Sequence, residues 1–380
     1  MEERRLARVR VYEPKIVKIP REKLEEWNKR LIRYSKEIDD CTFDVEETPK
    51  LMEDLFNYDY RRLFGKNSNL EELKQKLPKV KKHLSEYYNC DEEEICIGDY
   101  FPDKETRCPY KIILGDADFF GFFSTTLGEL QIIGGDADFS NSDVTDLCKL
   151  QVIGRCAHFQ GSNVTNLGKL QNIGVNADFE NSKVTDLCEL QIIGGNAYFE
   201  NSKVTNLGKL QNIGGNAYFE NSKVTNLGKL QNIGGDAHFN NSEITNLGKL
   251  QNIGGYAHFK NSKVTDLGEL KNIERDAYFM DSNVANLGNL QSIGGSVGFS
   301  DAEVTNLGEL QSIGGSAYFS NSKITDLGKL QSIGKDADFR KSIITDLGNI
   351  EYIGGEIKTD ASKSYLKEEY EIMIYGKSLK

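Results

Sequence analysis

Apolar residues along most of this chain fall into columns, in which equivalent positions are spaced 20 residues apart. One block, I-G-G-x-A-x-F-x-x-S-x-V-T-x-L-G-x-L, recurs without a slip in register from Lys111 to Tyr352. Phenylalanine fills one column from Phe119 to Phe339, and isoleucine fills another from Ile113 to Ile353. Apolar residues confined to fixed columns indicate side chains that stack on their own copies and bury a core that no single repeat could form. The pattern therefore predicts a solenoid.

Within each repeat, the A-x-F segment predicts a short strand. Its alternation places Ala197 and Phe199 on one face and the residue between them on the other. The Gly-Gly pair before the strand predicts a tight corner that uses glycine's freedom at positive φ, and N-S-x-V-T after it predicts a turn. Strands from successive repeats would pair in parallel at about 4.8 Å, so thirteen of them would form a sheet about 60 Å long.

The repeat resembles a known family. The segment from Ala197 to Val204 has the L-x-L-x-x-N-x-L spacing of leucine-rich repeats, with Ser202 in the slot of the ladder asparagine. The V-T-N-L and I-T-D-L segments that end at Leu207 and Leu327 are similar to the bacterial internalin type. This resemblance implies an α+β protein with a leucine-rich-repeat-like parallel β array of about 12 to 13 coils.

The repeat also departs from that family. Serine replaces asparagine, the unit of 20 residues is shorter than is usual for the internalin type, and alanine with phenylalanine replaces paired leucines. A three-sided parallel β-helix of 20-residue coils therefore stays open as the alternative fold.

The sequence divides into three regions. Residues 1–110 contain all six prolines and predict strand structure over 6–19, helices over 21–39, 48–64 and 69–88, and a strand over 94–101. This α-rich region is either a cap over the first coil, which an exposed solenoid end requires, or a separate domain. Residues 111–354 form the repeat array, and residues 355–380 a C-terminal cap, in which the run from Tyr370 to Tyr375 predicts a closing strand.

Composition points away from nucleic acid and membranes. The net charge is −11, and residues 111–380, with 24 basic and 33 acidic side chains, carry −9 of it. Such an array is a poor non-specific binder of phosphate backbones. We expect a cytoplasmic protein, because no signal segment and no apolar run of about 18 residues is visible, and seven cysteines suit a compartment that keeps thiols reduced.

No residue pattern for catalysis or cofactor binding is found. The chain lacks a nucleophile elbow, a phosphate loop and an H-E-x-x-H motif. Four of the cysteines precede the array without the paired spacing of zinc sites, and three lie in repeat slots: Cys41, Cys90, Cys96 and Cys108, then Cys148, Cys156 and Cys188. We therefore expect a protein that is not an enzyme, with no metal site and no cofactor.

The outward column between alanine and phenylalanine varies and is the first candidate binding surface. It reads Asp118, Asp138, His158, Asp178, Tyr198, Tyr218, His238, His258, Tyr278, Gly298, Tyr318, Asp338. Aromatic side chains are enriched at protein interfaces, because one ring offers a large contact area and a polar tip at low entropic cost. We therefore predict partner binding by Tyr198, Tyr218, His238, His258, Tyr278 and Tyr318. The alternatives are a ring column that only stabilises the sheet and, for the histidines, a metal site.

A second candidate surface lies at the start of the array, where Asp116, Asp118, Asp136 and Asp138 occupy adjacent outward slots. Carboxylates this close repel one another unless a cation or a basic partner is present. They serve either as ordinary solvated surface or to steer the protein towards a basic surface, such as the groove of a nucleic-acid-binding protein.

The resulting hypothesis is a non-enzymatic interaction protein of a bacterium or phage. It would bind another protein through the outward Tyr/His/Asp face, in its sharper form as an inhibitor of a nucleic-acid-binding partner. The alternative places an activity in residues 1–110 and leaves the repeats to target it.

Overall fold

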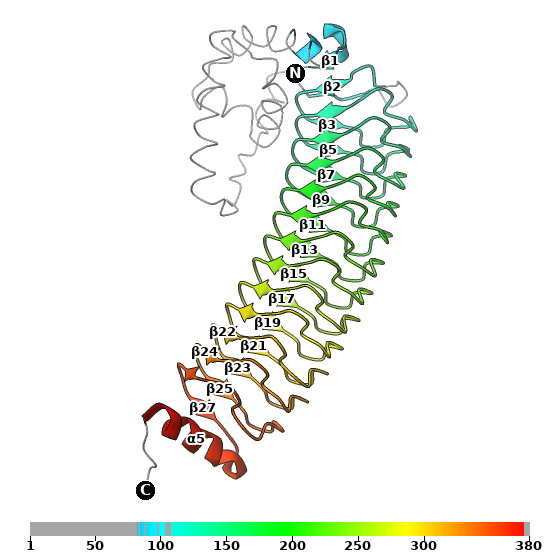
Figure 1. Ribbon diagram of the computed structural model, residues 1–380. Helices are drawn as coiled ribbons and strands as arrows, with labels where there is room; N and C mark the ends of the chain where they lie inside the picture. The colour runs from blue at the N-terminus through cyan, green and yellow to red at the C-terminus, as the bar shows by residue number, and fades with distance from the viewer. Residues whose placement is uncertain (1–81, 83, 87–88, 97–98, 103–107, 376–380) are drawn as a thin grey trace, which may run out of the picture.

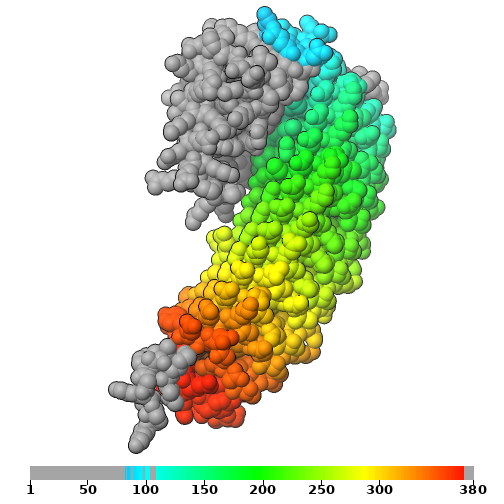
Figure 2. Space-filling view, viewed as in Figure 1, coloured from blue at the N-terminus to red at the C-terminus, as the bar shows by residue number. Residues whose placement is uncertain are grey.

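The protein is a parallel β-solenoid of about 13 coils that stack into a gently curved rod (Figure 1). It is a computed structural model that describes residues 82, 84–86, 89–96, 99–102 and 108–375. Adjacent coils touch along the whole rod (Figure 2). The predicted solenoid and its 20-residue period are thus confirmed.

Each coil contributes one two-residue strand to each of two parallel sheets. The fourteen strands of sheet A, in spatial order, are β1 (Ile95–Cys96), β2 (Ile112–Ile113), β4 (Ile132–Ile133), β6 (Val152–Ile153), β8 (Asn172–Ile173), β10 (Ile192–Ile193), β12 (Asn212–Ile213), β14 (Asn232–Ile233), β16 (Asn252–Ile253), β18 (Asn272–Ile273), β20 (Ser292–Ile293), β22 (Ser312–Ile313), β24 (Ser332–Ile333) and β26 (Tyr352–Ile353). The thirteen strands of sheet B are β3 (Ala117–Asp118), β5 (Ala137–Asp138), β7 (Ala157–His158), β9 (Ala177–Asp178), β11 (Ala197–Tyr198), β13 (Ala217–Tyr218), β15 (Ala237–His238), β17 (Ala257–His258), β19 (Ala277–Tyr278), β21 (Val297–Gly298), β23 (Ala317–Tyr318), β25 (Ala337–Asp338) and β27 (Ile357–Lys358).

Strand pairing follows the repeat register, so every column of the sequence becomes a row of neighbours in space. Ala197 pairs with Ala217, and Tyr198 pairs with Tyr218. A third side of the coil is linked by single bridges, such as Asp146 with Asn166. Two sheets and this third row of bridges are compatible with the β-helix alternative.

The corners of the coil depend on glycine for two different reasons. Two corner columns have left-handed backbone, at φ 53° for Asn201 and φ 57° for Gly208, which explains why Asn, Asp and Gly dominate them. The Gly-Gly corner does not, so its predicted dependence on positive φ is wrong. A Cβ atom on Gly194 would lie 2.1 Å from the carbonyl oxygen of Gly174. This corner favours glycine because adjacent coils approach each other too closely for a side chain to fit easily.

The core is a continuous stack of identical layers. In one coil the buried apolar side chains are Ala197, Phe199, Val204, Leu207, Leu210 and Ile213. The phenylalanines stack in parallel on their copies, with ring centroids 5.3 Å apart and planes within 1° for Phe119 and Phe139. The predicted core columns are confirmed.

The serine column does not behave as a hydrogen-bonded ladder. Ser202 is buried, yet its hydroxyl has no hydrogen-bond partner among the described residues. In the same column, Ser342 donates its hydroxyl to the Phe339 carbonyl at 2.8 Å. The slot that resembles the asparagine of leucine-rich repeats therefore does not link one coil to the next.

At the N-terminal end, short elements continue the solenoid. The 3-10 helix η2 (Glu92–Glu94) precedes β1, which pairs with β2, and Tyr100 bridges to Ala117, in line with the strand predicted over 94–101. Leu84, within the helical residues 84–86, packs on the outer face of sheet A against Ile112 and Ile132. The elements predicted over 6–19, 21–39 and 48–64, and most of 69–88, lie outside the described residues.

At the C-terminal end, the closing strand predicted for Tyr370 to Tyr375 is wrong. The 3-10 helix η3 (Ala361–Lys363) leads into the helix α5 (Ser364–Tyr375), which lies at the end of the rod (Figure 1). Leu366 and Tyr370 are four residues apart and so share one helix face. Leu366 is buried, and the Tyr370 hydroxyl accepts from the Ile353 amide at 2.6 Å and donates to its carbonyl at 3.0 Å. A side chain thus satisfies backbone groups at the edge of sheet A.

Among the described residues, no helix has the length and apolar character to cross a membrane.

Candidate interaction face of sheet B

The outer face of sheet B carries a continuous stack of aromatic rings. The second residue of each strand points outward, and five consecutive coils place a ring there, forming the ring ladder Tyr198, Tyr218, His238, His258 and Tyr278. Successive ring centroids lie 5.1, 4.7, 4.7 and 4.8 Å apart, with planes within 19° of parallel. Within the stack the rings cover each other's faces, so the three inner rings offer mainly their edges and polar tips to a partner.

The tyrosine hydroxyls of the ladder are held by the column two residues earlier. Asn196 donates to the Tyr198 hydroxyl at 2.9 Å, and Asn216 does the same for Tyr218. At the far end, the Tyr278 hydroxyl donates to Asp276 at 3.0 Å. Tyr198 and Tyr218 therefore act as acceptors within the described contacts, and their hydroxyl protons are available to a partner.

The structure brings together five of the six predicted aromatic residues. Tyr318 is separated from Tyr278 by the coil that carries Gly298, and it is 44% exposed, whereas the rings of the ladder are half-buried. His158 lies two coils before Tyr198, beyond Asp178, and is not part of the stack.

The glutamates Glu180, Glu200 and Glu220 form a column beside the ladder, and the carboxyl groups of Glu200 and Glu220 are partly buried. Oε2 of both Glu200 and Glu220 is buried and has no hydrogen-bond partner among the described residues. Burial, reinforced by the charges of Glu220 and Glu180, raises the pKa of Glu200 to about 7, and burial also raises the pKa of Glu220. The 20-residue spacing places Glu180, Glu200 and Glu220 in a column beside the ladder, but it does not reveal that the carboxyl groups of Glu200 and Glu220 are partly desolvated.

The two histidines at the centre of the ladder favour their neutral forms. Burial lowers the pKa of both His238 and His258, and for His238 the neighbouring imidazole lowers it further, while Asp236 acts in the opposite direction. His238 Nδ1 also lies 3.4 Å from Glu220 Oε1. Neutral imidazoles can stack between tyrosines without mutual repulsion.

The four aspartates at the start of the array are adjacent, as predicted, and each also has a structural role. Asp116 and Asp136 each accept the backbone amide of the residue 20 positions later, at 2.8 and 2.9 Å. Asp118 and Asp138 each accept the amide two residues later, at 2.9 and 2.8 Å. Burial raises the pKa of Asp116, and Arg155 Nε lies 3.7 Å from an oxygen of Asp136. One oxygen of every carboxylate is thus already used by the fold.

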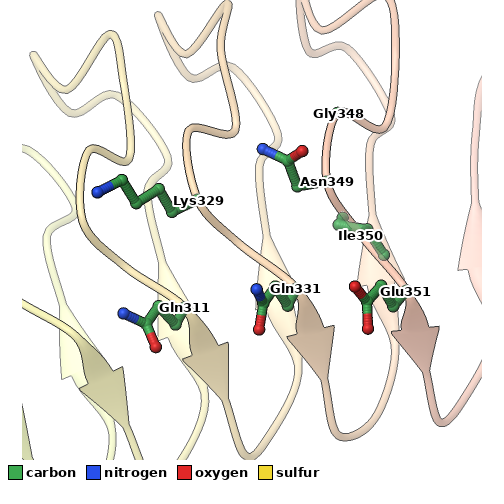
Figure 3. A pocket seen from close by; sticks show the side chains of 7 residues that line it. All are labelled: Gln311, Lys329, Gln331, Gly348, Asn349, Ile350 and Glu351. Atoms are coloured by element: carbon green, nitrogen blue, oxygen red, sulfur yellow. The ribbon is translucent and has the colours of Figure 1, made fainter.

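A hollow of about 550 Å³ lies near the C-terminal end of the rod (Figure 3). Gln311, Gln331 and Glu351 line it in one row, with Lys329 and Asn349 beside them. Lys329 pairs with Glu309 at 2.8 Å, and Asn349 donates to the Gly328 carbonyl at 2.7 Å. Glutamine fills the same position in most other coils, so this row shows no arrangement specific to one ligand.

Side chains suited to metal binding or thiol chemistry are dispersed. Within the described ranges, no three His, Cys, Asp or Glu side chains are grouped so that they could hold a metal ion. None of the six described cysteines is in a disulfide, and burial raises the pKa of Cys108 and of Cys156 to about 11. These two thiols stay protonated at neutral pH and are poor nucleophiles.

No protein-family model, curated protein or solved structure matches the chain. Function has to be inferred from the face of sheet B itself.

Proposed function

We propose that the protein is a non-enzymatic interaction module that binds another protein through the outer face of sheet B, with the ring ladder at the centre of the contact. The leucine-rich-repeat resemblance is in line with such a role. The proposal places the encounter in the cytoplasm, which agrees with the absence of disulfides among the described residues.

The observation that carries the proposal is the chemistry of this face. Five stacked rings form a rigid strip, and the hydroxyl protons of Tyr198 and Tyr218 are free to donate. Rigid aromatic surface loses little entropy on binding, and Tyr is among the residues most enriched at binding hot spots. Acidic side chains flank the strip at Glu180, Asp236 and Asp276. We therefore infer a partner with a basic contact surface, and the groove of a nucleic-acid-binding protein is one such surface.

The same contacts also support the competing role, in which the ladder only stabilises the sheet. Cross-strand aromatic pairs contribute about 0.2 to 1 kcal/mol each. An experiment has to separate binding from folding.

The test is the double variant Tyr218→Ala with His238→Ala. The partner is first isolated from the source organism by affinity purification with the full-length protein as bait. Binding is then measured with both proteins purified. We expect the variant to keep its circular dichroism spectrum and to bind at least about 30-fold more weakly, as for the loss of a hot spot of 2 kcal/mol or more. Tyr352→Ala is the matched control, because Tyr352 is an exposed aromatic residue on sheet A, and binding should not change.

Equal binding by the wild type and a folded double variant would exclude this face. The alternative, in which residues 1–110 carry the activity and the repeats target it, would then take precedence.

A further inference from the structure

The aromatic column has one missing ring. Gly298 occupies the outward slot between Tyr278, the last ring of the ladder, and Tyr318. His258 covers one face of the Tyr278 ring at 4.8 Å, and on the other side of Tyr278 the next coil offers no side chain.

The fold does not need glycine at this position. The φ of Gly298 is outside the left-handed region, and a Cβ atom there would meet only Met280 Cγ and Sδ, each at 3.5 Å. This is an ordinary van der Waals distance. By contrast, a Cβ atom on Gly294, in the same coil, would lie 2.2 Å from the Glu274 carbonyl oxygen. The missing side chain therefore has its consequence at the surface.

That consequence is a hollow of about 330 Å³, named here the ring slot. It is lined by Tyr278, Met280, Val297, Gly298 and Tyr318, together with serines at its rim. Neighbouring rings of the ladder are separated by 4.7 to 5.1 Å, so two tyrosines two coils apart leave room for the thickness of one more ring. Met280 is 41% exposed, and its flexible thioether can adapt to an incoming ring.

We propose that the ring slot binds one aromatic side chain of the partner protein, which stacks on Tyr278 and fills the missing position of the column. This inference rests on the proposed function. A protein side chain fits better than a nucleobase, because Asp276 lies next to the slot, in hydrogen-bond contact with Tyr278, and the chain as a whole carries a net charge of −11. Phosphates attached to a base would meet this negative charge.

The first test uses small probes on the full-length protein. Methionine methyl groups are labelled with ¹³C, and the Met280 signal is assigned with Met280→Leu. N-acetyltryptophanamide should shift the Met280 methyl signal by ring current in a saturable manner, whereas N-acetylleucinamide should not. Adenosine monophosphate should bind at least about tenfold more weakly than the tryptophan probe. Absence of any saturable shift with the tryptophan probe would overturn the ring slot, and tighter binding of the nucleotide would assign it to a nucleobase.

The second test fills the slot from within. Gly298→Tyr should keep the fold, supply the missing ring and weaken the tryptophan probe by about tenfold or more, because two stacking contacts are lost. Gly298→Ala is the matched control and should bind within about twofold of the wild type, since its Cβ atom fits. Tyr318→Ala removes the ring on the far side of the slot and should also weaken binding of the tryptophan probe. It provides a second variant if Gly298→Tyr does not fold.

Partner binding separates this inference from the proposed function. If Gly298→Tyr and Tyr318→Ala bind the purified partner like the wild type, while the Tyr218→Ala and His238→Ala double variant does not, the face is the interface and the ring slot is not part of it. Loss of partner binding in Gly298→Tyr, but not in Gly298→Ala, supports the slot.

Discussion

At the scale of single residues, one column can hold the same amino acid in physically different situations. The buried serines illustrate this. Ser222 is fully buried and its hydroxyl has no partner, whereas Ser342, near the end of the rod, donates to the Phe339 carbonyl. An unsatisfied buried hydroxyl opposes folding, while a satisfied one contributes about 1 kcal/mol. Ala302 already occupies this column in one coil and is buried.

We therefore predict opposite effects from the same substitution. Ser222→Ala should leave the free energy of unfolding unchanged or raise it by up to about 1 kcal/mol, because it removes an unsatisfied polar group. Ser342→Ala should lower it by about 1 kcal/mol, because the Phe339 carbonyl loses the hydroxyl donor and Lys363 Nζ loses the hydroxyl as an acceptor. Urea unfolding followed by circular dichroism measures both, and a clear loss of stability in Ser222→Ala would indicate a hydrogen bond that the described contacts do not contain.

Glu200 gives a second prediction, on pH. Its pKa is raised to about 7 from an ordinary value of 4.5, so the folded state holds the proton more tightly than the unfolded state. This contribution to stability is complete below about pH 4.5 and is lost as the pH rises through 7. Glu200→Gln removes the titrating group, so its melting temperature should exceed that of the wild type by more at pH 8 than at pH 5.5. A difference that does not change with pH would show that Glu200 remains well solvated.

At the scale of elements, the coils are joined by side chains that extend the backbone pairing of the two-residue strands. Along the column before sheet B, a side-chain oxygen accepts the backbone amide of the next coil, as Asn196 does for Asn216 at 2.8 Å. Sheet A carries a ladder of its own, in which Asn232 donates to Asn212 at 2.9 Å. Such short strands leave many amides at corners, and these columns satisfy part of them.

Asn196 tests this linkage. Asn196→Ala removes the acceptor of the Asn216 amide and should lower stability by about 1 to 2 kcal/mol, with faster hydrogen exchange at that amide. Asn196→Asp keeps an acceptor oxygen, as Asp136 does in the same column, and should preserve slow exchange. If both variants exchange alike, the ladder is not what protects this amide.

At the scale of the whole molecule, charge is distributed unevenly between columns. Lysines on other sides of the coil pair with glutamates one coil away, as Lys209 does with Glu189 at 2.5 Å, and each partner is nearly half exposed. Exposed pairs of this kind contribute little to stability. The aspartates at the start of sheet B accept backbone amides, and Arg155 lies near one of them, Asp136, so most of their negative charge is available for long-range attraction.

The aspartates give a prediction about association. Changing Asp116, Asp118, Asp136 and Asp138 together to Asn should preserve the fold, because an Asn side chain keeps the acceptor oxygen. Asn176 and Asn196 accept the amide of the next coil as Asp116 and Asp136 do, and Asn206 accepts the amide two residues later as Asp118 and Asp138 do. If the cluster steers a basic partner, the association rate should fall and lose most of its dependence on salt, and nucleic acid should compete with the wild type. A rate that is independent of salt in the wild type would mark the cluster as ordinary solvated surface.

The sequence by itself determined the solenoid, its period, its core columns and the outward position of the Tyr and His column. It could do so because a repeat in fixed register makes each residue the spatial neighbour of its own copy, so that linear spacing becomes contact. The aromatic stack from Tyr198 to Tyr278 follows from this rule alone.

Only the tertiary structure decided what depends on distances between coils and on the ends of the rod. The Gly-Gly corner is explained by the carbonyl of the preceding coil, the desolvation of Glu200 by its packed neighbours, and the helical conformation of Tyr370 to Tyr375 by the edge that it covers. The open volume beside Gly298 belongs to the same class, since a glycine in a sequence does not reveal whether the space above it is filled. Periodicity specifies which residues meet, whereas packing specifies how closely they meet and what remains empty.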